Sequence, residues 1–479
     1  MASHSYTQAL AYLYSFTDYE KQTAYLYSPD RFDLGRMYRL LAALDNPHRR
    51  FTSLHIAGTK GKGSVAAMSE RILREAGYHT GLFTSPHLHT FRERIRVDGQ
   101  FIPEGMVIEG LHRLQPHIPS IPGLTTFELI TALGFWYFAQ RSIDIAVVEV
   151  GLGGRLDATN VIMPLVSVIT SLSYDHTAIL GTTLAAIARE KGGIIKPRVP
   201  VVSAPQPEEA LPIIEEICKE RHAPLTLVGR DWQWRLQGAS CEGQSFSILR
   251  GPLTAAPTTR PSERELRLRS SDHKLEYWIP LLGRHQLVNA TTVLAAMDQL
   301  QGRGLGIPQS SIREGLRQVE WPGRLEVLGR RPWVVVDGAH NRASAQELRR
   351  ALEEIFPHRR LFLIFATYRD KDISRMLEVL LPLADELTVT HFDSPRAATA
   401  AQLEGWVRDM GIQATRADNV SQALAQACQR AAAQDLICVA GSVRFAGEAR
   451  MAWAKAEGQP LPPSDPPLPP SPEPAGVRP

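Results

Sequence analysis

Apolar runs alternate with amphipathic segments along most of the chain. The runs indicate strands, and the one at residues 143–151 is continuously apolar with Val and Ile, a pattern typical of parallel strands covered on both faces. They lie at residues 51–58, 143–151, 165–172, 333–341, 360–368, 386–392 and 435–442. Helical periodicity follows at residues 64–76, 184–191 and 343–355. This alternation predicts α/β parallel sheets joined by right-handed crossovers.

Three changes in the pattern divide the chain. Trp321-Pro322-Gly323 interrupts two ordered stretches, and short strand-like pieces (FSILRG, RELRLRS and KLEYWIPL) occupy residues 230–280. From Gly458 onward ten of 22 residues are proline, which predicts a disordered tail, either an inert extension or a Pro-rich ligand. We therefore expect a first domain over 1–322 with a β-rich segment at 230–280, a smaller second domain over 323–457, and a disordered tail over 458–479.

Charge and composition narrow the function classes. The 479 residues carry 53 Lys+Arg against 50 Asp+Glu, which gives no diffuse basic field for nucleic acid. Any anionic ligand must therefore meet local positive charge. The four cysteines form no CxxC pair, so zinc-ribbon and disulfide frameworks are not expected. A cytoplasmic enzyme with no membrane partner is expected, because the chain has neither a signal-peptide pattern nor an apolar run of membrane-spanning length.

A glycine-rich segment with two lysines separates the first expected strand from its helix. It consists of Gly58, Thr59, Lys60, Gly61, Lys62, Gly63 and Ser64. Glycines let backbone N–H groups turn toward phosphate oxygens, and the start of the helix adds a positive dipole end. Lys62 would reach the β- and γ-phosphates of a nucleotide. The alternative is a turn that is merely flexible, since Ile56 replaces the first glycine of the standard P-loop pattern.

Three more residues stand beside expected strands or helix ends. Glu149 closes the apolar run AVVEV, where a carboxylate is costly unless it is paired or metal-bound; it is either a Mg²⁺ ligand or a partner for Arg155. His176 follows the next strand, at the sheet edge where α/β proteins bind ligands, and is either functional or structural. By spacing alone, Lys191 is a helix-terminal lysine whose charge suits the helix dipole.

Several motifs occur in the order typical of one family. They are GTKGKGS (58–64), TSPHL (84–88), ERIRVDG (93–99), TTFE (125–128), EVGLGGRLDATN (149–160), DHTAILGTTLAAIAREKGGIIK (175–196), GRHQLVNA (283–290), WPGRLE (321–326), DGAHN (337–341), RDKD (369–372), SPRA (394–397) and GSVRFAGE (441–448). With them the chain resembles the folylpolyglutamate synthase/dihydrofolate synthase family of Mur-ligase-like amide ligases. The resemblance implies a P-loop-containing parallel-sheet ATPase domain and a smaller Rossmann-like α/β C-terminal domain.

The resemblance also implies roles for individual residues. The Mg²⁺ ligands would be Ser85, Glu149 and His176, with Lys191 as a carbamate. The ATP contacts would be Gly58, Thr59, Lys60, Gly61, Lys62, Gly63, Ser64, Asn289, Arg324 and Asp337. The pterin would lie against Phe32, Asp33, Leu34, Thr125, Thr126, Phe127, Glu128, Leu156, Asp157 and Ala158. The catalytic residues would be Lys62, His176, Lys191, Arg324 and His340.

The activity implied by the resemblance is ATP-dependent ligation of L-glutamate to a pterin or folate carboxylate through an acyl phosphate. The acceptor would be dihydropteroate, reduced folate or both, and the family suggests a monomer. One alternative is a Mur-type ligase acting on a UDP-sugar, although the residues before Gly58 leave little room for the N-terminal domain of those enzymes. The other is a non-catalytic nucleotide-binding switch protein, which would not release ADP in response to glutamate.

Overall fold

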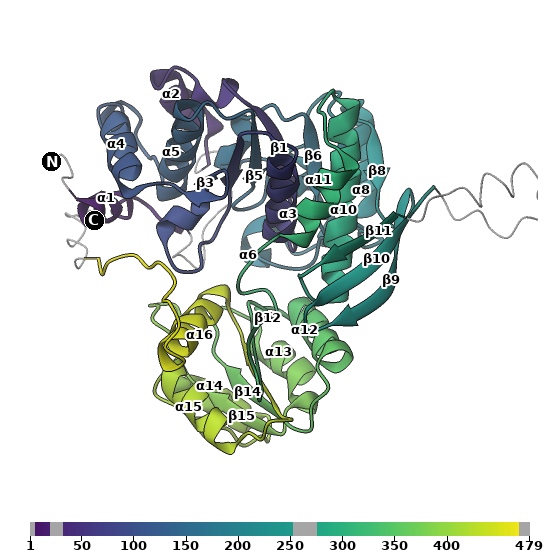
Figure 1. Ribbon diagram of the computed structural model, residues 1–479. Coiled ribbons are helices and arrows are strands. Elements are labelled where there is room, and N and C mark those ends of the chain that lie inside the picture. The colour runs from purple at the N-terminus through teal and green to yellow at the C-terminus, as the bar shows by residue number, and fades with distance from the viewer. Residues whose placement is uncertain (1–4, 20–31, 252–274, 469–479) are drawn as a thin grey trace, which may run out of the picture.

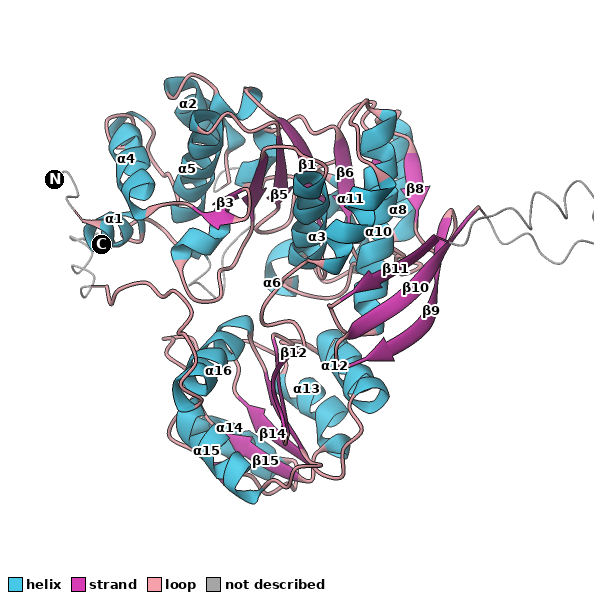
Figure 2. Ribbon diagram, viewed as in Figure 1, coloured by secondary structure: helices cyan, strands magenta, loops and turns pink. Residues whose placement is uncertain are grey.

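The computed structural model describes residues 5–19, 32–251 and 275–468. They form two α/β units, one above the other in Figure 1, and each unit has its own sheet (Figure 2). No helix among these residues is long and apolar enough to cross a membrane.

The first unit is built on an eight-stranded sheet with the order β4-β3-β2-β5-β1-β6-β7-β8. Neighbours from β2 through β8 are parallel, whereas β3 and β4 add an antiparallel edge. The strands are β1 Thr52–Ala57, β2 Thr80–Phe83, β3 Ile95–Val97, β4 Gln100–Phe101, β5 Ile145–Glu149, β6 Val166–Ile169, β7 Val201–Ser203 and β8 Leu225–Leu227.

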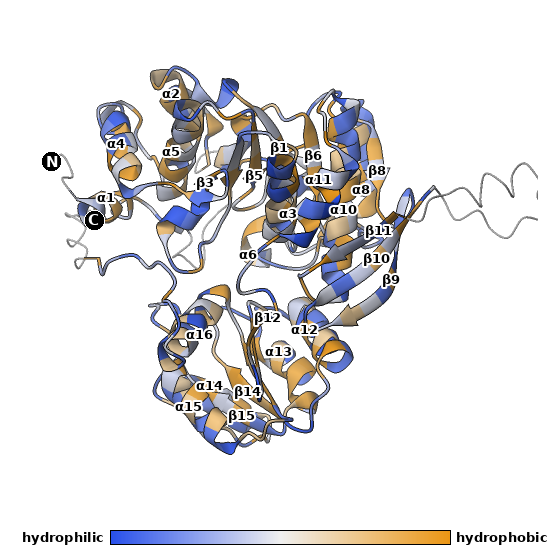
Figure 3. Cartoon of the chain, in the orientation of Figure 1, coloured by the Kyte–Doolittle hydropathy of each residue, from blue (hydrophilic) through white to orange (hydrophobic). Residues whose placement is uncertain are grey.

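Helices cover both faces of this sheet. They are α1 Tyr6–Leu13, α2 Leu34–Ala43, α3 Lys62–Glu75, α4 Glu104–Leu114, α5 Thr126–Gln140, α6 Thr177–Leu180, α7 Leu184–Gly192, α8 Leu211–Glu220, α10 Arg284–Gly302 and α11 Gln309–Arg317. Leu54 and Ile56 of β1 pack in one core with α3 and α10. Ala146 and Val148 of β5 pack in another with α5. Because both faces are covered, β1 and β5 are buried at nearly every position. In β5 every residue before Glu149 is apolar (Figure 3).

A three-stranded antiparallel sheet packs against α10 and α11 of the first unit. Its strands are β9 Trp232–Ser240, β10 Gly243–Arg250 and β11 Leu275–Ile279. These lie in the stretch where the sequence predicts a β-rich segment. The expected piece RELRLRS, at residues 264–270, falls outside the described residues.

The second unit has a six-stranded sheet with the order β12-β13-β17-β14-β15-β16, parallel except for the β12–β13 pair. Its strands are β12 Glu326–Arg330, β13 Trp333–Asp337, β14 Leu361–Phe365, β15 Glu386–Val389, β16 Thr415–Arg416 and β17 Leu436–Ala440. Its helices are α12 Arg342–Ile355, α13 Ile373–Leu380, α14 Ala400–Asp409, α15 Val420–Arg430 and α16 Val443–Ala456.

The sequence predicts a disordered tail over 458–479, of which residues 469–479 lie outside the described residues. Residues 459–468 have neither helix nor strand, but Asp465 accepts hydrogen bonds from Tyr6, Thr90 and Phe91 of the first unit. These three hydrogen bonds to the Asp465 carboxylate hold a segment whose composition alone predicts no ordered structure.

Candidate active site

A cavity of about 1670 Å³ lies between the two units. Its walls include the segments that follow β1, β5 and β6 in the first unit and β13 in the second. Ligands of open α/β sheets bind at these carboxyl ends of parallel strands. The tertiary structure therefore brings the ligand-binding edge of one sheet to face that of the other.

All the predicted site residues except Thr126 line this cavity. Thr126 instead directs its hydroxyl away, donating to the carbonyl oxygens of Leu13 and Phe16. The residues brought together are Phe32, Asp33, Leu34, Gly58, Thr59, Lys60, Gly61, Lys62, Gly63, Ser64, Ser85, Thr125, Phe127, Glu128, Glu149, Leu156, Asp157, Ala158, His176, Lys191, Asn289, Arg324, Asp337 and His340.

The glycine-rich segment forms a tight loop between β1 and α3. The backbone N–H groups of Thr59 and Lys60 both donate to the carbonyl oxygen of Ser171, each at 3.1 Å. Gly58 has a φ of +147°, and a Cβ there would lie 1.8 Å from the Thr170 hydroxyl oxygen. The loop is therefore held against the segment after β6, in a path that requires glycine.

Helix α10 supports the same loop through its amides. Gln286 donates from Nε2 to the Ser64 hydroxyl at 3.2 Å and accepts from Asn289 Nδ2 at 2.9 Å. Asn289 also lies against Gly61, where a Cβ would be 2.3 Å from its Oδ1 atom. Gln286 was missed in the sequence, although it belongs to the GRHQLVNA motif.

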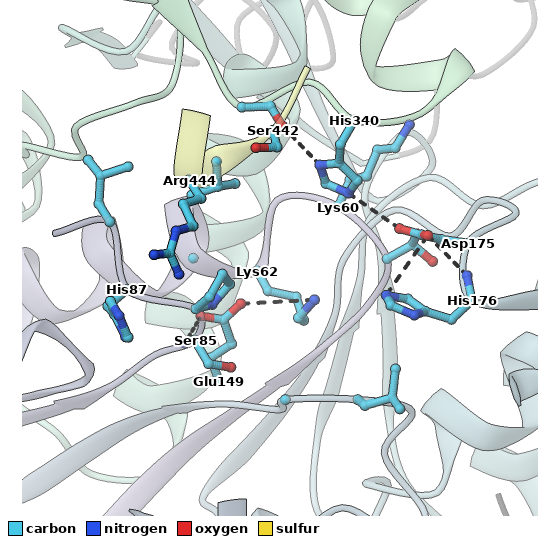
Figure 4. Close-up of a pocket in the computed structure, with 18 of the residues that line it drawn as sticks. Lys60, Lys62, Ser85, His87, Glu149, Asp175, His176, His340, Ser442 and Arg444 are labelled. Carbon is cyan, nitrogen blue, oxygen red and sulfur yellow. Dashed lines mark hydrogen bonds and ion pairs between the residues drawn. The ribbon is translucent and has the colours of Figure 1, made fainter. Parts of the chain in front are cut away.

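Glu149 ends β5 as a buried carboxylate. Its Oε2 atom accepts from the Ser85 backbone N–H at 3.1 Å, and its Oε1 atom lies 3.9 Å from Lys62 Nζ (Figure 4). Burial raises the pKa of Glu149, and the Lys62 ammonium opposes that rise. Arg155, the structural partner considered from the sequence, pairs with Glu190 at 2.8 Å instead.

Asp175 links the two units, a role missed in the sequence. Its carboxylate lies 3.3 Å from Lys371 Nζ and 3.5 Å from His340 Nε2, and it accepts from Asn341 Nδ2 at 3.4 Å. Burial opposes ionisation, but the hydrogen bond to His340 and the nearby positive charge hold the pKa of Asp175 well below its usual range. An ionised Asp175 therefore attracts the second unit toward the segment after β6.

His176 directly follows this carboxylate, at a φ of +50°. Desolvation lowers its pKa to about 4, so the imidazole is neutral at pH 7 and offers a lone pair. His340 donates from Nδ1 to the Gly338 carbonyl oxygen at 2.8 Å, which leaves Nε2 facing Asp175 (Figure 4).

Two further lysine amines are buried at the phosphate loop, those of Lys191 and Lys60. Lys191 lies in the last turn of α7 and donates from Nζ to the Gly58 carbonyl oxygen at 2.9 Å. Burial, aided by the Lys62 charge, lowers its pKa to about 7. Burial also lowers the pKa of Lys60 to about 8, and among the described residues its Nζ atom has no hydrogen-bond partner. The amines of Lys60, Lys62 and Lys191 thus lie at the loop, and that of Lys60 can donate a hydrogen bond to a ligand.

The second unit supplies a guanidinium and a carboxylate. Asp337 ends β13 and accepts from the backbone N–H groups of Leu325 and Ala339, each at 2.8 Å. Arg324 contacts the Gly323 carbonyl at 3.2 Å. Burial lowers the pKa of Arg324 and raises that of Asp337, and each charge opposes the other's shift. Arg324 remains cationic, since its ordinary pKa lies far above neutrality.

The residues predicted for the pterin lie on the first unit. Thr125 and Glu128 cap the start of α5 reciprocally, and Glu128 pairs with Arg36 Nε at 3.0 Å. Asp157 accepts from the Leu152 N–H at 2.9 Å. Burial raises the pKa of both carboxyls. Arg36 was missed in the sequence because its partner lies 92 residues away.

The donor set of the predicted metal site fits Mg²⁺. Ser85 and Glu149 offer a hydroxyl and a carboxylate from neighbouring segments, and Mg²⁺ prefers oxygen donors while keeping several waters. His176, on the segment after β6, offers a nitrogen to the same cavity. Among the described residues no group of three or more His, Cys, Asp and Glu side chains forms a metal cluster, so a site here depends on the Ser85 hydroxyl and on water.

Comparison with known proteins decides the family. Residues 56–297 match the Mur ligase middle domain, and residues 323–443 match the Mur ligase glutamate ligase domain. The dihydrofolate synthase/folylpolyglutamate synthase of Bacillus subtilis is 34% identical over 399 residues, covering 81% of this chain and 88% of that protein. The chain belongs to the folylpolyglutamate synthase/dihydrofolate synthase family.

Other members of the family agree in sequence and structure. The folylpolyglutamate synthase of Lacticaseibacillus casei is 35% identical over 384 residues, covering 78% of this chain and 83% of that one. The structure of E. coli FolC in complex with DHPP and ADP superposes with a TM-score of 0.79 at 30% identity, covering 96% of this chain and all of that one. The predicted family, α/β fold class and ATP-dependent folate glutamate ligase activity are confirmed.

Proposed function

We propose that this ligase joins L-glutamate to a pterin-bearing acid, dihydropteroate or a reduced folate, with ATP bound at the Gly58–Ser64 loop. The observation that carries the proposal is a single cavity that joins this loop to the segments predicted to hold the pterin. Glu149 and Ser85 line the same cavity, and Glu149 lies 3.9 Å from Lys62 of the loop.

In the first step, an acceptor carboxylate oxygen attacks the γ-phosphorus of ATP, and the bond from that phosphorus to the bridging oxygen breaks. ADP leaves with the electron pair, and an acyl phosphate forms. Lys62 and Lys60 of the loop, with Arg324 from the second unit, neutralise charge on the transferring phosphoryl group. Lys60 suits this role because its buried amine has no partner among the described residues.

In the second step, the amine nitrogen of glutamate attacks the acyl carbon, the bond to phosphate breaks, and the nitrogen loses a proton. Water would hydrolyse the acyl phosphate, so the cavity must close before it forms. Asp175 supports closure through its contacts with Lys371 and His340 of the second unit. His340 would lie near the nucleotide when the units meet.

Mg²⁺ is the proposed cofactor, with Ser85, Glu149 and His176 as its ligands. When bound, it would neutralise phosphate charge as a Lewis acid. The uncharged Lys191 amine is proposed to add to CO₂ and lose a proton, which gives a carbamate whose oxygen would be a further ligand. Its burial supports this, because only an uncharged amine is nucleophilic. A monomeric state and a cytoplasmic location stay predictions from the sequence.

The test is incubation of the purified protein with ATP, [14C]glutamate and each pterin acid separately. We expect labelled product and ADP release that depend on both glutamate and the acceptor. Release that needs no amino acid would refute the ligase assignment for this chain. Product formed only with a UDP-sugar would indicate the Mur-type alternative.

Three variants test the assigned roles. We expect Lys62→Ala and His176→Ala to fold normally and to lose ligation by about 100-fold or more, as removal of a group that stabilises the transition state does. Lys191→Arg should be inactive although it keeps the charge, because arginine forms no such carbamate. Lys219→Ala, on the surface helix α8, is the control. Near-parental turnover in any of the three would refute the role of that residue.

A further inference from the structure

The start of the C-terminal tail passes from the second unit to the first. We call residues 459–468 the strap; in Figure 1 it runs from α16 toward α1. Half of its ten residues are proline. Because each proline ring fixes φ, an extended proline-rich segment loses little conformational entropy when it is held in place. A small number of contacts is therefore enough to dock the strap.

Asp465 provides these contacts. Its Oδ1 atom accepts from the Tyr6 hydroxyl at 2.8 Å and from the Thr90 hydroxyl at 2.6 Å, and its Oδ2 atom accepts from the Phe91 N–H at 2.6 Å. Phe91 is the first residue of a short 3-10 helix, Phe91–Arg94, whose first N–H groups lack partners within the helix. Hydrogen bonds to a carboxylate are stronger than those between neutral groups.

The strap meets a loop that the second unit already holds. Leu88 packs so closely on α16 that a Cβ at Gly447 would lie 2.7 Å from the Leu88 carbonyl oxygen. Arg450 of α16 lies 2.6 Å from His89 through Nη1 and Nε2. Asp465 extends these contacts to the next two residues, Thr90 and Phe91. The strap therefore continues an interface between the two units.

The strap also forms part of the cavity wall. Residues 464–468 line the cavity, as do Leu10 and Tyr14 from the region of α1. The Tyr14 ring contacts the Phe91 ring edge to face, at 6.5 Å between centroids. The predicted pterin segment, residues 32–34, lines the same cavity. Pro466, Pro467 and Leu468 present apolar surface there, which suits an aromatic ligand.

We propose that the strap is a wall of the acceptor site and that Asp465 is the positioning residue that holds it there. The inference rests on the proposed function for the chemical class of the acceptor, an acid bearing a fused heteroaromatic ring. None of the three groups that anchor Asp465 belongs to the phosphate loop. The strap therefore acts on the acceptor and leaves ATP binding unchanged.

The test compares Asp465→Ala with the full-length parent. We expect the KM for the pterin acid to rise about tenfold, equivalent to about 1.4 kcal/mol, while the KM for ATP stays within twofold. Tyr6→Phe, which removes one of the three donors, should give a smaller rise, and Asp465→Asn an intermediate one. Glu457→Gln removes an exposed carboxylate at the base of the same segment and should behave as the parent.

Hydrogen exchange at the Phe91 amide reports docking independently of activity. We expect faster exchange in Asp465→Ala than in the parent. Unchanged exchange would refute the claim that Asp465 anchors the strap. Faster exchange with an unchanged KM for the acceptor would refute the claim that the strap is a wall of the acceptor site. Equal rises in the KM values for ATP and for the acceptor would refute the claim that the strap affects acceptor binding alone. A parent that ligates glutamate to no pterin acid would refute the proposed function instead, and the exchange measurement would still decide the anchoring.

Discussion

Alanine at Gly61 would test the geometry of the phosphate loop. Gly61 precedes α3 with a φ of +86°, and an added Cβ would lie 2.3 Å from Asn289 Oδ1. A left-handed backbone costs an L residue about 1–2 kcal/mol. Overpacking of the added Cβ against Asn289 costs a further amount of about 1–3 kcal/mol. We therefore expect Gly61→Ala to lower the free energy of unfolding by about 2–5 kcal/mol, the sum of both effects.

Gly77 is a matched control at the other end of α3. Its φ is +88°, and a Cβ there would meet no atom within 4 Å. Gly77→Ala therefore measures the backbone cost alone, about 1–2 kcal/mol. Adding Asn289→Ala to Gly61→Ala removes the clashing amide, so the stability of the double variant should return toward that of Gly77→Ala.

Urea-induced unfolding gives the stabilities, and steady-state kinetics gives the KM for ATP. We expect that KM to rise in Gly61→Ala, because the displaced loop no longer aims its N–H groups at phosphate, and to stay unchanged in Gly77→Ala. If Gly61→Ala were no less stable than Gly77→Ala and bound ATP equally well, the loop would not be constrained as described.

Three other changes test the surroundings of the site. Glu128→Gln leaves the Arg36 guanidinium buried without its carboxylate, so we expect the free energy of unfolding to fall by about 3 kcal/mol. Urea titration measures this change, and an unchanged unfolding midpoint would contradict it. Asp175→Asn removes the charge that attracts Lys371, so kcat/KM should fall at least tenfold and small-angle scattering should report a more open molecule; unchanged scattering and kinetics would refute the link. Burial lowers the pKa of His48 to about 4 from its ordinary 6.5. Between these values the unfolded chain binds more protons, so stability falls as the pH drops from 6.5 to 4, and His48→Gln should flatten that dependence; an identical slope would show that His48 is not responsible.

Local patterns in the sequence predict much of the architecture. The apolar runs become β1, β5, β6, β13, β14, β15 and β17, because a strand covered on both faces is mostly apolar. The loop at Gly58–Ser64 is equally local, since its path depends on glycines at fixed places in the chain. The order of the motifs along the chain predicts the family and, through it, the activity.

The tertiary structure alone decides which distant charges meet. Asp175 and Lys371 are 196 residues apart, and Asp465 and Thr90 are 375 apart. No periodicity connects such pairs, because their contact depends on how the two units pack. Lys191 shows the same limit: its helical spacing suggests an ordinary terminal lysine, yet packing buries its amine against the Gly58 carbonyl, 133 residues away. The sequence determines which side chains are available and where each strand ends, whereas long-range packing determines their partners, their burial and hence their pKa values.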